Sequence, residues 1–137
     1  MVAIDVRTAH RAGALYFLGV FALGFLLGGV RLMLLVPWLG ELVAVLVEVP
    51  VILLGCWVLC RRAIVQTGLS SRKPERLAMG ATAFIYLLLA ETVLAAVFFA
   101  TSPSEYVASL LTPAGAAGLM GQLLFAAFPL IQDWNAS

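Results

Sequence analysis

Four long apolar segments dominate this sequence and limit the folds open to it. They cover residues 15–36, 39–60, 77–100 and 114–131. An α-helix needs about 20 mostly apolar residues to cross the roughly 30 Å hydrocarbon core of a bilayer. We therefore expect an all-α, polytopic integral membrane protein with four transmembrane helices in an up-down bundle.

The composition supports this class and excludes others. Of the 137 residues, 64% are hydrophobic and 11% are charged, whereas a soluble domain has roughly half apolar and a quarter charged residues. Soluble enzymes, nucleic-acid binders and disordered regulators do not fit these proportions. We expect residues 1–137 to form a single transmembrane domain, with a polar loop over 61–76.

The segment before the fourth apolar stretch has two helix-start signals. The S-P-S-E motif that begins at Ser102 is typical of a capping box with proline at the first helical position, and a second cap-then-proline pair begins at Thr112. One helix over 103–131 would be about 43 Å long, more than the bilayer core requires. We predict a short interfacial helix over 104–111 and a break at Pro113; a kinked continuous helix is the alternative.

The basic residues predict an orientation. Seven of the eight lie before the first apolar segment or in the loop 61–76: Arg7, Arg11, Arg61, Arg62, Arg72, Lys73 and Arg76. By the positive-inside rule, both termini and this loop are expected to be cytoplasmic, in a cell membrane that we take to be a bacterial inner membrane. Orientation and phospholipid contact explain the basic loop, and no nucleic-acid partner is needed.

Four polar residues interrupt the apolar segments. A charge at the bilayer centre costs at least ~2.5–3.5 kcal/mol on insertion scales, so such residues normally face the bundle interior in pairs. Arg31 and Glu48 are symmetric about the turn near residues 39–40, each roughly 8–13 Å deep at 1.5 Å per residue, which predicts an ion pair. Glu91 and Gln122 reach a similar level. The sequence thus predicts a buried polar layer with one member from each span.

The charges of this layer do not balance. One arginine and two carboxylates would leave a net negative charge in a low-dielectric site. We expect Glu48 to be ionised against Arg31, and Glu91 to be protonated or to share a proton.

Small residues share helix faces with the polar layer. Spacings of three and four residues place glycines near each polar position, and glycine permits close approach of transmembrane helices. The expected packing positions are Gly24, Gly28, Gly55, Gly80, Gly115 and Gly118.

Pro50 predicts a kink in the second span. It removes one backbone donor and frees the carbonyl of Leu46. Two interpretations remain open: a neighbour satisfies that carbonyl, or it binds a cation or water beside Glu48.

No motif for catalysis, cofactor binding or metal binding is present. His10 is the single histidine, and Cys56 and Cys60 are expected to be apolar packing residues. We therefore expect no enzymatic activity, no cofactor and no metal.

Three functional hypotheses follow. The first is an oligomeric proton- or cation-responsive transporter or channel, since an intramembrane ionisable residue is by default a functional candidate. The alternative is a non-catalytic accessory or assembly subunit of a larger membrane complex, in which the polar layer would only fix helix register. A membrane enzyme acting on lipid or quinone has the least support.

Overall fold

The chain is helical apart from short connections. A computed structural model describes residues 5–136, with side chains as far as Gln132. Its elements are α1 (Val6–Val30), the π-helical η1 (Arg31–Leu35), α2 (Val36–Leu39), α3 (Glu41–Thr67), α4 (Lys73–Phe99), α5 (Pro103–Ser109) and α6 (Pro113–Ala136). Within the described residues no strand is present. The expected all-α fold is confirmed.

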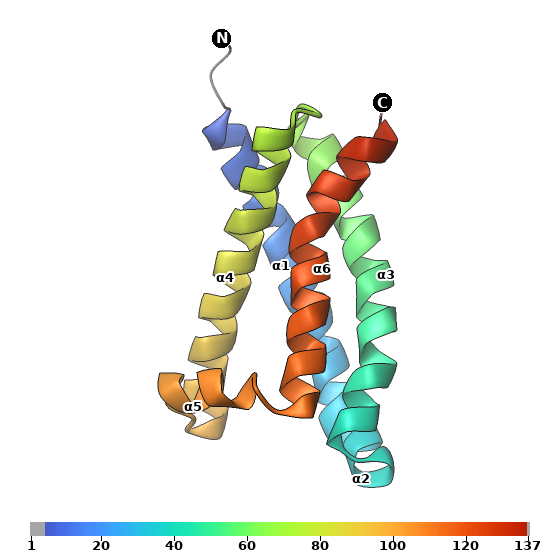
Figure 1. Cartoon of the computed structure of the whole chain (residues 1–137), viewed down its shortest axis with the longest axis vertical. Helices are drawn as coiled ribbons and strands as arrows, with labels where there is room; N and C mark the ends of the chain where they lie inside the picture. The colour runs from blue at the N-terminus through green and yellow to red at the C-terminus, as the bar shows by residue number, and fades with distance from the viewer. Residues whose placement is uncertain (1–4, 137) are drawn as a thin grey trace.

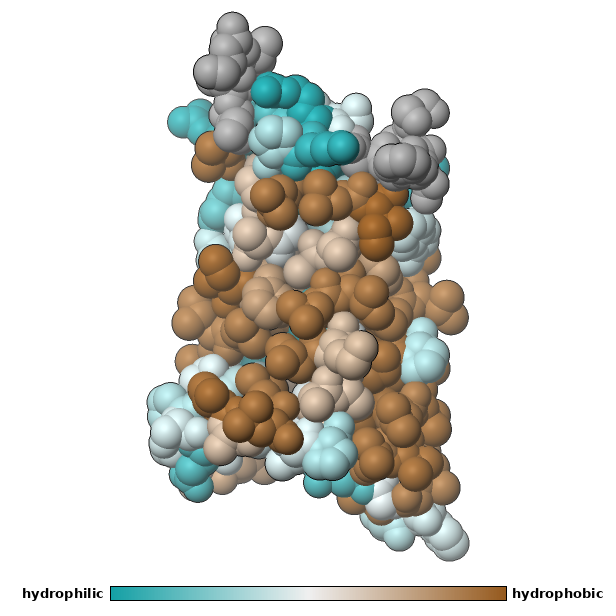
Figure 2. Space-filling view, viewed as in Figure 1, coloured by the Kyte–Doolittle hydropathy of each residue, from teal (hydrophilic) through white to brown (hydrophobic). Residues whose placement is uncertain are grey.

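Four of the helical stretches are long and apolar enough to cross a membrane. They cover Val6–Leu39, Glu41–Thr67, Lys73–Phe99 and Pro113–Gln132, and each includes most or all of one predicted span. On the face shown in Figure 2, a broad hydrophobic band covers the middle of the molecule, and hydrophilic residues gather towards its ends. The four apolar helices therefore suggest a membrane protein.

The four long helices form a bundle in which sequence neighbours are not always spatial neighbours. Chain direction reverses from each long helix to the next (Figure 1). Helices α1 and α6 each pack along both α3 and α4. Helices α3 and α4 therefore stand diagonally opposite each other, although they are consecutive. The bundle consists of two antiparallel hairpins, α1–α3 and α4–α6, joined through parallel helix pairs.

The connection between the hairpins is shorter than the expected loop 61–76. It covers only residues 68–72, because α3 and α4 both continue beyond the apolar segments. Gly68 ends α3 in the left-handed region at φ 68°, and its N–H donates to the carbonyl of Ile64. Pro74 lies in the first turn of α4, where a missing N–H has no cost.

The turn of the first hairpin contains a widened helical segment. In η1 the N–H of Val36 donates to the carbonyl of Arg31, five residues earlier. Pro37 follows directly, and a proline displaces the carbonyl of the preceding helical turn. A π-turn is one of the ways in which a helix accommodates such a disturbance. Gly40, at φ 82°, then reverses the chain into α3.

The second hairpin is broken, as the cap signals predict. In the capping box of α5, the Ser102 N–H donates to Glu105 Oε1 (3.0 Å) and the Glu105 N–H donates to Ser102 Oγ (3.2 Å). A second helix begins at Pro113, where Thr112 Oγ1 accepts from the Gly115 N–H at 3.1 Å. The kinked continuous helix is wrong.

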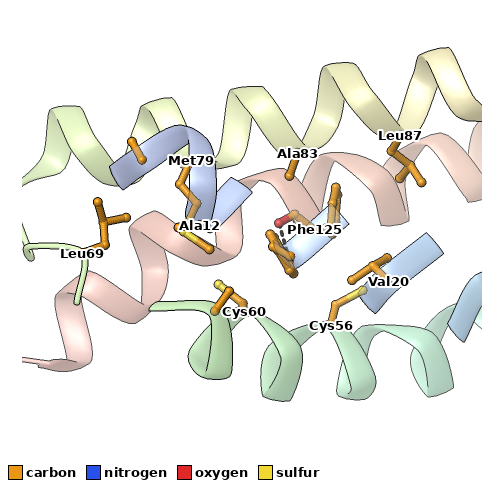
Figure 3. Close-up of a cluster of buried hydrophobic side chains, with 12 residues drawn as sticks. Ala12, Val20, Cys56, Cys60, Leu69, Met79, Ala83, Leu87 and Phe125 are labelled. Carbon is orange, nitrogen blue, oxygen red and sulfur yellow. Dashed lines mark hydrogen bonds between the residues drawn. The ribbon is translucent and has the colours of Figure 1, made fainter. Parts of the chain in front are cut away.

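The hydrophobic core fills one half of the bundle. We call the end with residues 68–72 the loop end, and the end with Gly40 and α5 the turn end. The buried residues of α1 lie between Ala9 and Val20, and those of α4 between Glu75 and Leu87, in the loop-end half. Figure 3 shows the core side chains that meet there, among them Cys56, Cys60, Met79 and Phe125. The predicted polar residues lie in the other half.

Candidate functional site

Arg31 and Glu48 form an ion pair across the first hairpin. The Arg31 NH1 group donates to Glu48 Oε2. Glu48 is 9% exposed, whereas Arg31 keeps 29% of its side-chain surface exposed. The turn at Gly40 brings η1 beside α3 and so places both groups at one level, where the sequence predicted them.

Glu91 is held by two donors from two other elements. Its Oε2 atom accepts from the Tyr106 hydroxyl at 2.5 Å and from Gln122 Nε2 at 2.6 Å. The carboxyl group belongs to α4, the phenol to α5 and the amide to α6. Each helix of the second hairpin therefore contributes one polar group to this cluster.

Tyr106 is a site residue that the sequence pattern did not single out. Burial raises the pKa of Tyr106, and its hydrogen bond to Glu91 raises it further. Tyr106 therefore remains a hydrogen-bond donor at physiological pH. The signal that could have found it is its position on the short capped helix that directly follows the span with Glu91.

The four predicted polar residues form two groups rather than one network. Arg31 pairs with Glu48, and Gln122 binds Glu91. The ion pair lies close enough for both of its charges to act on the Glu91 carboxyl. Each hairpin thus supplies one complete group to the turn-end half of the bundle.

One atom of this layer is left without a partner. Gln122 Oε1 is buried and accepts no hydrogen bond within the part of the chain that the structure describes. A buried carbonyl oxygen without a donor costs free energy, so its environment needs an explanation. The nearest part of the site is the Glu91 carboxyl, to which the same amide is already bound.

Four of the six predicted packing glycines lie against another part of the chain. A Cβ atom at Gly24 would contact Ile52 at 3.3 Å, and one at Gly55 would collide with Leu23. A Cβ atom at Gly80 would collide with the carbonyl oxygen of Ala126, and one at Gly115 with that of Ser109. The approaches at Gly80 and Gly115 are to backbone atoms and require glycine, whereas those at Gly24 and Gly55 are to the ends of flexible side chains.

The other two glycines do not pack between helices. At Gly118 nothing lies within 4 Å of a Cβ position, and at Gly28 the nearest atom is the Arg31 side chain at 3.8 Å. The packing role predicted for Gly28 and Gly118 is therefore corrected. Helical spacing placed them on the same stripes as the polar residues, but no neighbouring helix lies against either position.

The two predicted kink positions differ. Pro50 lies inside α3 on its exposed side, as does Leu46, whereas Glu48 between them is buried. Pro113 is not inside a helix but begins α6.

A second buried polar cluster lies at the loop end, where the sequence predicted only loop residues. Glu75 and Arg76 are 1% and 3% exposed. Glu75 Oε1 accepts from the backbone N–H of Asp5 (3.1 Å) and from Arg72 (3.1 Å). The Arg76 guanidinium donates to the carbonyls of Ser70 (2.9 Å) and Pro129 (3.1 Å). This cluster ties α4 to the start of α1, to residues 68–72 and to α6.

A surface groove runs along the outer face of α3 near the loop end. It has a volume of about 470 Å³ and is lined by Trp57, Val58, Arg61, Arg62, Val65 and Gln66. All these residues belong to one helix, so the groove is an open surface depression and not an enclosed pocket. Arg61 and Arg62 give it a positive charge.

The thiols and the histidine stand apart from the polar layer. Cys56 and Cys60 are free and buried in the loop-end core, while His10 contacts the Tyr86 hydroxyl between α1 and α4. Among the described residues, no group of three or more histidine, cysteine or acidic side chains could hold a metal ion.

Comparison with known proteins assigns no family to this arrangement. No protein-family model matches the chain, and no curated protein or solved structure shows significant similarity to it.

Proposed function

We propose that the chain is a small integral membrane protein that works as an oligomeric proton- or cation-responsive transporter or channel. The observation that carries this proposal is the Glu91 carboxyl, held by Tyr106 and Gln122 beside the Arg31–Glu48 ion pair. Ionisable groups at membrane depth are costly and usually mark an ion or proton path. A group that only fixes helix register does not need a second carboxyl group.

The position of the site in the bundle supports a transport role. The loop-end half is filled by packed side chains, whereas α1 beyond Val20 and α4 beyond Leu87 have no buried residue. The polar layer lies in the turn-end half, where, among the described residues, only α3 and α6 have buried ones. In our proposal, ions or protons reach it from the turn end, and the loop-end core closes the opposite side.

The basic groove supports the proposed orientation. Arg61 and Arg62 lie at the loop end beside Trp57, a combination typical of the cytoplasmic headgroup region. We place the loop end and both termini in the cytoplasm, with phospholipid as the immediate partner. Helix α5 then lies at the outer interface. We propose an oligomer because four short helices enclose little internal volume.

Flux measurements test this function. Purified protein in proteoliposomes should conduct protons or monovalent cations with a strong pH dependence, and Glu91→Gln and Glu48→Gln should abolish it. Glu41→Gln is the matched control, because Glu41 is exposed at the turn end. Equal flux in all three variants and the wild type would refute the roles of Glu91 and Glu48.

An accessory role in a larger membrane complex is the second candidate. It is favoured by the closed Arg31–Glu48 pair, which can hold two helices in register without moving any ion. Native electrophoresis after mild solubilisation separates the two. A discrete homo-oligomer supports the transporter, and co-migration with other membrane proteins supports the accessory role.

A further inference from the structure

The two oxygen atoms of Glu91 have different surroundings. Oε2 accepts both the Tyr106 hydroxyl and the Gln122 amide N–H. Within the described residues, no protein donor is recorded for Oε1. Both donors direct their hydrogen atoms at Oε2, so that atom has the environment of a carbonyl oxygen.

The side-chain amide of Gln122 makes a hydrogen bond through its nitrogen but none through its oxygen. Its nitrogen donates to Glu91 Oε2, but its oxygen is buried without a partner. A neutral carboxylic acid pairs with an amide through two bonds: the amide N–H donates to the acid carbonyl, and the acid O–H donates to the amide oxygen. The structure contains the first of these bonds and the free acceptor for the second.

We infer that Glu91 carries a proton on Oε1 and donates it to Gln122 Oε1, so that the two side chains form a closed acid–amide pair. A hydronium ion on the turn-end side supplies the proton: one of its O–H bonds breaks, a new O–H bond forms on Glu91 Oε1, and a water molecule is released. This inference rests on the proposed function in one respect: it names the proton as the species that the site binds.

The same atoms argue against a metal cation. Calcium takes six to eight oxygen ligands and magnesium takes six, whereas the free acceptors of this cluster are one oxygen of Glu91 and one of Gln122. Oε2 already faces two hydrogen atoms, one from the Tyr106 hydroxyl and one from the Gln122 amide. A proton needs only two oxygens.

Each element around Glu91 contributes a defined group. Arg31 comes from η1, Glu48 from α3, Tyr106 from α5 and Gln122 from α6. Glu48 is the other carboxyl that a titration could report, and it is engaged by Arg31. Substitution of Glu48 is therefore the control that assigns a titration to Glu91.

Infrared spectroscopy of the full-length protein in lipid vesicles tests the inference. The wild type at neutral pH should show a carboxylic-acid C=O band that shifts in D₂O. Glu91→Gln should abolish the band and still fold, because an amide can bond to Gln122. Glu48→Gln should retain it. Absence of the band in the wild type, or its loss in Glu48→Gln alone, would overturn the assignment.

The hydrogen bond from Glu91 to Gln122 can be tested by the frequency of the acid C=O band, which a change in packing alone would not shift. Gln122→Met keeps the volume but removes both hydrogen bonds, so the acid band should move to higher frequency. Tyr106→Phe removes one bond to Oε2 and should cause a smaller shift. An unchanged band in Gln122→Met would show that the acid is not paired with this amide.

Flux and infrared results separate the two proposals. An acid band assigned to Glu91 in a protein without flux would keep the proton site and remove the transport function. Flux that depends on Glu91, with no acid band and with a carboxylate band that responds to Na⁺ or K⁺, would keep the transport function and overturn the proton as its ligand.

Discussion

Tyr16 donates its hydroxyl proton to the backbone carbonyl of Phe125 at 2.6 Å. Pro129 lies four residues after Phe125 and has no N–H, so this carbonyl has lost its helical donor. The two side chains also stack, with ring centroids 4.3 Å apart. A tyrosine of α1 thus replaces a missing helical bond in α6, the helix diagonally opposite.

Tyr16→Phe should therefore destabilise the protein. It leaves a buried carbonyl without a donor, which costs about 1–3 kcal/mol, while the ring remains. Thermal unfolding in detergent measures the effect. The control is the same change in a Pro129→Ala background, where the restored N–H can bond to Phe125. A loss of equal size in both backgrounds would contradict the proposed replacement.

Arg31→Leu should leave Glu48 buried without its counter-ion. Breaking a fully buried pair costs roughly 3–5 kcal/mol. We expect a value at or below the low end, because Arg31 is 29% exposed and its charge is partly solvated. The double variant Arg31→Leu/Glu48→Leu should recover much of the loss. Unchanged melting temperatures for both proteins would show that the pair does not stabilise the bundle.

Arg76 and Arg61 both lie in the loop-end half of the bundle but should respond differently to substitution. Arg76→Gln removes bonds to the carbonyls of Ser70 and Pro129 from a residue that is 3% exposed. We expect a loss of about 2 kcal/mol or more, since buried hydrogen-bonded charges are costly to disrupt. The Arg61 side chain is exposed, so Arg61→Gln should change the free energy of unfolding by less than about 0.5 kcal/mol. Chemical unfolding of the two variants makes the comparison.

Gly80→Ala and Gly118→Ala form a matched pair. A Cβ atom at Gly80 would collide with the Ala126 carbonyl oxygen and force α4 and α6 apart, with an expected cost of about 1–3 kcal/mol. At Gly118 the space is open, so the better helix propensity of alanine should leave stability unchanged or slightly raised. Similar melting temperatures for the two variants would contradict the close approach at Gly80.

The cap of α5 should weaken in acid. The backbone N–H of Ser102 and then its hydroxyl hold the pKa of Glu105 below its ordinary value. A lowered folded-state pKa means that the stabilisation is present above the ordinary value and is lost as pH falls through the lowered one. Hydrogen exchange over 103–109, corrected for the intrinsic rate, should show this loss. Glu105→Gln should remove the pH dependence.

The sequence predicted local and one-dimensional features well. Cap-then-proline signals at Ser102 and Thr112 located both helix starts, and counting from the turn near Gly40 matched Arg31 with Glu48. These predictions depend only on the rise of a helix per residue and on the residues that cap a helix.

The remainder depends on how the helices are placed around each other. Periodicity put Gly28 on an inward stripe, but it could not reveal that only the Arg31 side chain lies near that position. Tyr106 reaches Glu91 because of the angle at which α5 lies. The sequence pattern placed Arg76 in the loop 61–76. Its partner, the carbonyl of Pro129, is a backbone group, and a residue's identity does not indicate which side chain its carbonyl will bind.

The division of the polar layer between the hairpins has a consequence for biosynthesis. Arg31 and Glu48 both belong to the half of the chain that is made first, and the Glu91 cluster belongs to the half made second. Chains emerge from the ribosome amino terminus first. The arginine therefore already has its counter-ion within the part of the chain that is completed first, and a joint insertion of these two helices would carry no net charge from this pair. A chain that matched Arg31 with Glu91 instead would leave a lone guanidinium in lipid until the third helix arrived.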